Sequence, residues 1–181
     1  MPVDADGSAS SDSEPQLLAR ACVSIGPVPD WVRPFSLDMG FTSKGSEHLS
    51  ELLNSLQVHA ELNQHSRHAA RRLETAQAVQ ENSQWSLEFE PRTQRIVFHF
   101  FRVRRGEVEI DQLKLANARV IQREQGLERF TIDGCFTWLL VLEDIRVRDV
   151  LEWSYTVEHN PTLLPGICRC GFAMPDLVSV A

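Results

Sequence analysis

The stretch DIRVRDVLEWSYTVEHNP, residues 144–161, decides the fold. Apolar side chains occupy its odd positions, and polar or charged side chains occupy most of its even positions. Successive side chains of a β-strand point to opposite faces, so the pattern predicts a strand with one buried and one solvated face. The charged pair Arg148-Asp149 interrupts the pattern and predicts a bend or tight turn. The side chains expected together on the buried face are Leu151, Trp153, Tyr155 and Val157.

Length and composition indicate one globular domain. The chain has 181 residues, of which 43% are apolar, and its formal net charge is −7. A chain of this length can bury a substantial core. The mild negative charge argues against nucleic acid as a partner, and no apolar run is long enough to cross a bilayer. We therefore expect no nucleic-acid partner and no membrane partner.

The cysteines are expected as free thiols in a reducing compartment, because no secretory signal is recognisable at the start of the sequence. They are Cys22, Cys135, Cys168 and Cys170. The expected location is the cytoplasm.

Two regions are predicted, a disordered acidic tail over residues 1–20 and a single β domain over residues 21–181. The opening MPVDADGSASSDSEPQ has four acidic side chains and no Lys or Arg, a composition typical of disorder. The prolines of GPVPDWVRPF (26–35) fix φ and lack a donor, so an extended segment should lead into the domain.

Strand signals follow one another from Trp85 onward. WSLEFEP (85–91) alternates, and RIVFHFFRV (95–103) is apolar on both faces, as in a strand covered on both sides. Residues 104–107 are expected as the turn that follows. Asp133-Gly134 predicts a two-residue hairpin, because both central positions of that turn need positive φ. Further strand candidates are VEI (108–110), LANARVIQRE (115–124) and MPDLVSVA (174–181).

Residues 47–80 fit two secondary structures. LLNSLQVHAEL (52–62) has leucines at helical spacing but also alternates as a strand does. HAARRLETAQAV (68–79) has helical propensity without an apolar stripe. Periodicity alone does not decide this segment. For the domain as a whole, strand upon strand with short turns predicts an all-β, mostly antiparallel two-sheet β-sandwich.

GICRCG (166–171) is the most suggestive motif for chemistry. Cys168 and Cys170 could begin a zinc site, but such sites usually have C-x₂₋₄-C spacing and a second ligand pair, which the sequence lacks. Cys168 as a nucleophile would need a histidine from upstream, because no His follows Cys170. We therefore expect no metal, no cofactor and no catalytic residue.

Histidines and arginines supply the other candidates. His59, His65 and His68 form a loose cluster in Arg-rich surroundings and are expected as solvated surface side chains. His99, between two phenylalanines, is expected as a hydrogen-bonded core residue.

A basic edge is made by Arg102, Arg104 and Arg105. We favour a solvated strand end for these arginines over a contact with a partner's carboxylate. No Gly-rich phosphate loop, serine nucleophile elbow or paired-carboxylate motif occurs.

The run from Trp31 to Pro165 resembles the domain of unknown function found on the N-terminal side of bacterial transglutaminase-like domains. The matching pieces occur in one order: DWV (30–32), LQVHAE (56–61), HAARRLETAQAV (68–79), FEPRTQRIVFHFFRVRRGE (89–107), QREQGLERFTIDGCFT (122–137) and LEDIRVRDVLEWSYTVEHNP (142–161). This chain departs from the family at Arg148-Asp149, where Gly-Asp is usual and glycine would suit a positive-φ turn. Many relatives are exported, whereas this chain shows no export signal.

The resemblance implies a mostly antiparallel β domain that precedes a cysteine-peptidase-like domain of transglutaminase fold. The catalytic Cys, His and Asp of that fold lie downstream of this domain, so no catalytic residue is carried over. The matching segments are strands in the family, which favours strand over helix for residues 47–80. The end of the chain suggests a fragment, an excised domain, or a product that lacks its enzyme part.

The first hypothesis for function is a non-catalytic accessory domain that packs against, or presents substrate to, a transglutaminase-like catalytic domain in cis or in trans. An alternative is a free-standing β-sandwich binding module for carbohydrate or peptide, and a third is an enzyme that uses Cys168. The residues expected to contact a partner are Arg104, Arg105, Asp149, Leu177 and Val178. The apolar end around Leu177 also predicts an edge strand that pairs within the domain or self-associates weakly.

Overall fold

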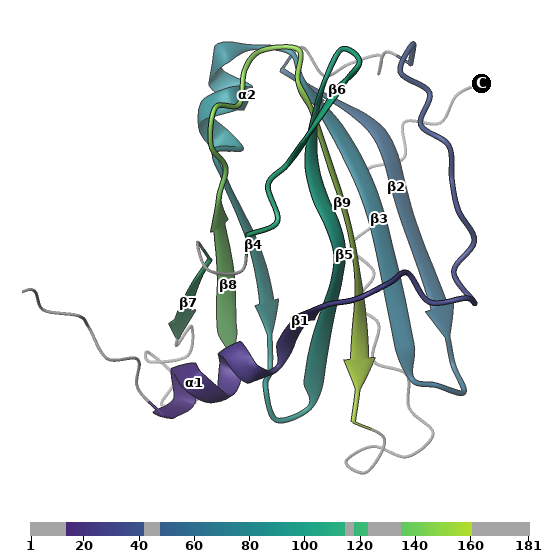
Figure 1. The fold of residues 1–181 in the computed structure, drawn as a ribbon, viewed down its shortest axis with the longest axis vertical. Helices are drawn as coiled ribbons and strands as arrows, with labels where there is room; N and C mark the ends of the chain where they lie inside the picture. Colours follow the sequence, from purple (N-terminus) through teal and green to yellow (C-terminus); the bar gives the residue numbers. More distant parts are fainter. Residues whose placement is uncertain (1–13, 42–47, 115–117, 123–134, 161–181) are drawn as a thin grey trace, which may run out of the picture.

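The structure, a computed structural model, describes residues 14–41, 48–114, 118–122 and 135–160 (Figure 1). Its helices are α1 (Glu14–Ala21) and α2 (Ala76–Glu81). Its strands are β1 (Val23–Ile25), β2 (Leu49–His59), β3 (Gln64–Leu73), β4 (Gln84–Phe89), β5 (Gln94–Arg105), β6 (Val108–Asp111), β7 (Arg119–Gln122), β8 (Phe136–Val141) and β9 (Val150–His159). Neither helix in these residues has the length and apolarity that crossing a bilayer requires.

Within the described residues the strands form two sheets (Figure 1). The larger sheet has the order β1-β5-β9-β3-β2, with β6 added to β5, and the smaller has the order β4-β8-β7. β1 runs parallel to β5, and the other strand pairs are antiparallel. The predicted all-β, mostly antiparallel two-sheet architecture is confirmed.

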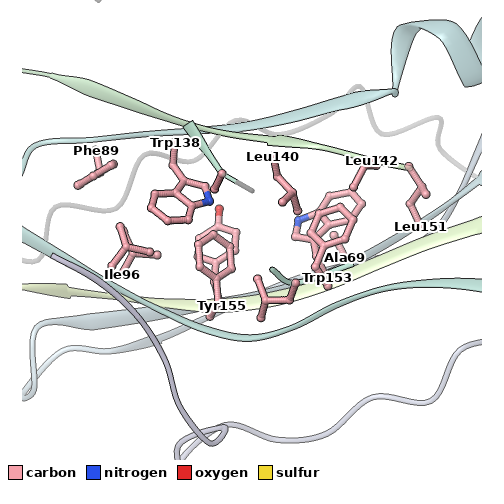
Figure 2. Packing of buried hydrophobic residues seen from close by; sticks show 14 of the residues in the cluster. Ala69, Phe89, Ile96, Trp138, Leu140, Leu142, Leu151, Trp153 and Tyr155 are labelled. Carbon is pink, nitrogen blue, oxygen red and sulfur yellow. The ribbon is translucent and has the colours of Figure 1, made fainter. Parts of the chain in front are cut away.

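β9 occupies the middle of the larger sheet, between β5 and β3. The side chains predicted to be buried together face the smaller sheet and are all buried, namely Leu151, Trp153, Tyr155 and Val157. Figure 2 shows Trp138 and Leu140 of β8 on one side of the core, with Trp153 and Tyr155 of β9 on the other. Stacking of two sheets face to face explains why this alternation was readable from the sequence.

Trp85 of β4 is the aromatic centre of this core. Its ring makes edge contacts with centroid distances of 5.7 Å to Phe98, 5.5 Å to Phe101, 6.0 Å to Trp153 and 6.0 Å to Tyr155. Edge-to-face geometry is the favourable arrangement for aromatic rings at these distances. A single side chain of the smaller sheet therefore contacts both β5 and β9.

The even-numbered face of β9 was expected to be solvated, and this expectation is wrong. Glu152, Ser154 and Thr156 are 1%, 3% and 1% exposed. The reason is the central position of β9 in the sheet. Side chains of the two flanking strands cover its outer face: His68 and Arg102 contact Glu152, and His99 contacts Thr156. The purple lead-in segment, residues 26–41, also runs on this outer side of the sheet, away from the core (Figure 2).

The predicted interruption before β9 is a tight turn. Arg148 has φ 75° and its N–H donates to the Leu73 carbonyl at 2.6 Å, while the Asp149 N–H donates to the Arg146 carbonyl at 3.1 Å. The strand therefore begins at Val150 and not at Ile145. A left-handed conformation costs a non-glycine residue about 1–2 kcal/mol, which explains why glycine would suit position 148.

The expected tail over residues 1–20 is too long by several residues. Glu14–Ala21 forms α1, which packs against β1 and β7, and Ala19 is fully buried. Composition predicted disorder because acidic and serine residues precede this helix, whereas burial of Ala19 depends on strands far along the chain.

The uncertain segment 47–80 is mostly strand, as the resemblance implied. β2 and β3 form an antiparallel pair with a register irregularity between Glu51 and Leu53. The strand expectation is wrong for Ala76–Glu81, which is α2. Thr75 caps this helix by accepting a hydrogen bond from the Ala78 N–H at 3.2 Å, and such a cap satisfies one of the free N–H groups of the first turn.

The expected turn at residues 104–107 is displaced toward the C-terminus. β5 continues through Arg105, and the turn is made at Gly106, whose φ is 59°. Val108 then begins β6, as predicted. The predicted hairpin at Asp133-Gly134 and the predicted strand at residues 174–181 lie outside the described residues.

Truncating a buried aromatic residue tests this core. Replacing Trp153 with Ala should lower the free energy of unfolding by about 3–5 kcal/mol, because the indole is buried between β4 and β5. Denaturant titration of both proteins measures the loss. Val108→Ala is the control, since Val108 is 59% exposed and should change stability by less than about 0.5 kcal/mol. A comparable loss in the two variants would contradict the assigned core.

Candidate functional site

A buried carboxylate, Glu152, lies on the outer face of the larger sheet. Its side chain is 2% exposed and is surrounded by donors from β3 and β5. Oε2 accepts hydrogen bonds from Nε of Arg102 at 2.9 Å and from Nε of Arg104 at 2.6 Å. Oε1 lies 2.8 Å from Nε2 of His68 and accepts from Nη2 of Arg102 at 3.2 Å. Both carboxylate oxygens are therefore engaged.

These donors hold Glu152 in its ionised form. Burial by itself would raise the pKa of Glu152, but the hydrogen bonds from His68, Arg102 and Arg104 outweigh burial and lower the pKa to about 2. Register explains the match, because Arg102 lies directly opposite Glu152 in the β5–β9 ladder. A carboxylate with so low a pKa is a poor general base at neutral pH.

Other polar groups extend this cluster along the outer face. Glu109 of β6 accepts from Arg102 at 2.8 Å and pairs with Arg104 at 2.7 Å. His99 lies 3.0 Å from the Gly26 carbonyl through Nδ1 and 2.8 Å from the Thr156 hydroxyl through Nε2. His99 is thus hydrogen-bonded, as predicted, but the expectation that it lies in the core is wrong, because it is half-buried and lines a pocket. Its two bonds join the lead-in segment to the centre of the sheet.

A pocket of about 390 Å³ borders the cluster. Its lining combines apolar, acidic and basic side chains, namely Ile25, His99, Phe100, Arg102, Glu109, Asp111 and Leu113. The Arg102 guanidinium lies 4.5 Å from the centroid of the Phe100 ring, a cation–π arrangement. This pocket is the concave feature nearest the buried carboxylate.

A second ion cluster holds the turn before β9. Arg105 binds the buried carboxylate of Asp149 in bidentate fashion, at 2.9 Å and 2.8 Å. Asp149 also accepts the Arg146 backbone N–H at 2.8 Å, and Asp144 accepts from Arg105 at 3.1 Å. Hydrogen bonds that Arg105 donates to Asp149 and Asp144 raise the pKa of Arg105. The end of β5 is thereby tied to the turn.

The residues predicted to contact a partner have these surroundings. Arg104, Arg105 and Asp149 come together at one end of the larger sheet, and each is engaged in ion pairs within the chain. The expectation of a solvated end for the arginines is wrong, because buried carboxylates bind them. Leu177 and Val178 lie outside the described residues. Contact of any of these residues with a partner stays a prediction.

The sequence pattern did not identify Glu152 as a candidate site residue, because its even position predicted a solvent-exposed side chain. One signal could have identified it. The neighbouring strand carries Arg102 and Arg104 at alternate positions, on one face of a segment that is otherwise apolar on both faces. Two arginines at such positions indicate an acidic group across the ladder.

The three clustered histidines are half-buried, so the expectation of solvated side chains is wrong. His68 contacts Glu152, and the His59 ring makes an edge contact with Trp31 at 5.5 Å. His65 Nδ1 lies 3.2 Å from Nε2 of His159. Burial chiefly, then His159 and Arg67, lower the pKa of His65 to about 4, so this ring is neutral at neutral pH.

Cys22, one of the described cysteines, carries a free thiol. Burial raises the pKa of Cys22, and nearby Arg95 offsets only part of this effect. Its thiol donates to the Pro91 carbonyl at 3.4 Å. A thiol with a raised pKa is a poor nucleophile. Cys168 and Cys170 lie outside the described residues, within which no group of three or more His, Cys, Asp or Glu side chains could hold a metal ion.

The fold and its ion clusters define a two-sheet, mostly antiparallel β domain whose outer face is stabilised by paired arginines and carboxylates. The chain belongs to DUF3857, a domain of unknown function with a solved structure, whose family model matches residues 61–180. No curated protein matches the sequence.

A solved structure has a similar fold. It is the crystal structure of a "putative protease" from Parabacteroides distasonis ATCC 8503, with a TM-score of 0.51 and 11% sequence identity. The similarity covers 62% of this chain and 23% of that chain. At this identity the likeness concerns the fold alone.

The acid dependence of stability tests the Glu152 cluster. The pKa of Glu152 in the folded protein, about 2, is below its ordinary 4.5, so its stabilising effect is present above about pH 4.5 and is lost as the pH falls through about 2. The loss should approach about 3 kcal/mol. Unfolding free energies measured between about pH 6 and pH 2 should fall less steeply in Glu152→Gln than in the parent.

The matched control for this comparison is Glu61→Gln, which removes an exposed carboxyl and should leave the acid slope close to that of the parent protein. Equal slopes in Glu152→Gln and the parent would show that the arginines do not stabilise the ionised carboxylate. The pKa of Glu74 is also lowered to about 2, by Ser50, Arg72 and Arg148 against the effect of burial. The unfolding free energy of all three proteins should therefore still fall with pH because of Glu74.

Proposed function

We propose that this protein is a non-catalytic accessory domain that packs against, or presents substrate to, a transglutaminase-like catalytic domain in cis or in trans. The observation that carries the proposal is the coverage of the structural match. The fold corresponds to 23% of a longer chain described as a "putative protease". In that chain, a domain of this kind is accompanied by much more polypeptide, where catalytic machinery can lie.

The chemistry of the described residues supports a non-catalytic role. Glu152 is ionised and engaged by three side chains, so it has little capacity left to take a proton from a substrate. The Cys22 thiol has a raised pKa and donates to a backbone carbonyl. The strongest clusters thus join strands to one another, as a domain that positions another domain requires.

The surface that we propose for the contact is the end of the larger sheet near the turn before β9. Arg148 is 72% exposed at the side chain, and Arg146, Val147 and Val108 are exposed beside it or at the neighbouring hairpin. The Arg105–Asp149 pair fixes the turn that carries them. Exposed apolar and arginine side chains on a rigid support are typical of protein interfaces.

The alternative, a free-standing module for carbohydrate or peptide, stays a prediction. The pocket beside Phe100 is the place where such a ligand would be sought.

The isolated chain should show no peptidase, amidase or transglutaminase activity. The reason is that the Cys22 thiol has a raised pKa, and the catalytic residues of the transglutaminase fold are expected on another domain. Turnover of a fluorogenic peptide amide and incorporation of a labelled amine measure these activities. Cys168→Ala and Cys22→Ala serve as controls, and turnover abolished by either change would contradict the proposal.

Binding tests the partner directly. A transglutaminase-like domain from the same genome should bind the chain, and Arg148→Glu together with Arg146→Glu should weaken the complex at least tenfold by reversing two exposed charges. Surface plasmon resonance gives the dissociation constants. Glu61→Lys, at the distant β2–β3 turn, is the matched charge control and should bind as the parent does. If both variants bind the catalytic domain as tightly as the parent does, the contact does not lie at the turn before β9.

A further inference from the structure

Two histidines face each other at the end of the sheet opposite the Arg105 turn. His65 of β3 and His159 of β9 have ring centroids 5.3 Å apart, and Nδ1 of His65 lies 3.2 Å from Nε2 of His159. They come from strands that pair antiparallel over Gln64–Arg72, so the sheet itself sets their separation. Ring nitrogens this close either share a proton or share a metal ion.

A third polar group nearby has no partner. Asn63 is 8% exposed, and its Oδ1 is buried without a hydrogen bond. Its backbone carbonyl accepts the N–H of His159 at 3.0 Å, which places Asn63 directly beside that histidine. A buried acceptor without a donor costs about 1–3 kcal/mol. The cost is removed if a cation or a cation-bound water occupies the adjacent space.

The distances suit a transition metal. Metal–nitrogen bonds of about 2.0–2.1 Å at a tetrahedral angle put two ligand nitrogens about 3.3 Å apart. The two imidazole nitrogens are already 3.2 Å apart. We propose that Asn63 Oδ1, His65 Nδ1 and His159 Nε2 form a binding site for a divalent transition-metal ion of the Zn²⁺ or Co²⁺ type, with water in the remaining position.

One of the proposed ligands borders a pocket. His159 lines a pocket of about 430 Å³, together with Glu158, Asn160 and residues of α1 and of the β4–β5 turn. Asn63 and His65 are not among the residues that line it, so the pocket reaches the histidine pair only on the His159 side. Arg67 opposes the site, because its charge is close enough to lower the pKa of His65.

The site is independent of the proposed accessory role and has its own test. Co²⁺ added to the full chain should give d–d absorption with 1:1 stoichiometry and without thiolate-to-cobalt charge transfer. The absence of that charge-transfer band separates this site from Cys168 and Cys170. Zn²⁺ should displace the cobalt, and calorimetry should give the affinity for Zn²⁺.

Four variants make the test decisive. Asn63→Gly keeps the left-handed turn, since the φ of Asn63 is 53°, but removes the oxygen ligand, so Zn²⁺ affinity should fall at least tenfold. Asn63→Asp supplies a charged oxygen at the same place and should raise affinity. His65→Asn should abolish binding, and Arg67→Gln should strengthen it by removing the opposing charge.

The control is His48→Asn, which removes an exposed histidine far from the pair in sequence and should leave Zn²⁺ affinity unchanged. The proposal is overturned if the parent chain binds neither ion, if the cobalt spectrum is that of thiolate ligation, or if Asn63→Gly and His65→Asn bind as the parent does. Circular dichroism confirms the fold of each variant. Asn63→Gly keeps the test valid if His65→Asn does not fold.

Discussion

The central position of β9 is the constraint on which the rest of the structure depends. This strand pairs with β5 on one side and β3 on the other, and both of its faces are buried. A charged side chain in such a strand must be neutralised by its neighbours, because burial of an unpaired carboxylate is far more costly than any gain from packing. Arg102 and Arg104 neutralise Glu152, and His68 contacts its other carboxylate oxygen; all three come from the two strands that flank β9.

The opposite ends of the larger sheet then differ in character. At one end, Arg105 and Asp149 fix a turn that contains a left-handed arginine. At the other end lie the His65–His159 pair and Asn63, whose Oδ1 has no hydrogen-bond partner, and His159 borders a pocket. The first end presents exposed arginine and valine side chains and suits a protein contact. The second presents two imidazole nitrogens and an amide oxygen, the ligands of the proposed cation site.

The family match and the structural match support different conclusions about this protein. Membership of DUF3857 is established over residues 61–180, and the fold is shared with part of a much longer chain. Neither the family nor the shared fold assigns an enzymatic activity to this protein. The accessory role rests on the coverage of that match together with the chemistry of the described residues, in which the ionised Glu152 and the protonated Cys22 thiol are both poorly suited to catalysis.

The sequence by itself determined the strands whose faces differ in polarity. Leu151, Trp153, Tyr155 and Val157 alternate because one side of β9 packs on a second sheet, and a period of two records that burial directly. The interruption at Arg148-Asp149 was readable for the same reason, since a charged pair breaks the alternation. Family resemblance added the strand assignment of β2 and β3, which periodicity alone left open.

The tertiary structure decided what local pattern cannot encode. Glu152 is polar and was placed in solvent, yet the register of β5 and β3 puts Arg102 and His68 around it. His65 and His159 are far apart in the chain, and only the β3–β9 ladder brings their nitrogens to 3.2 Å. Alternation reports which face a side chain occupies, whereas its partner depends on which strands become neighbours and in which register.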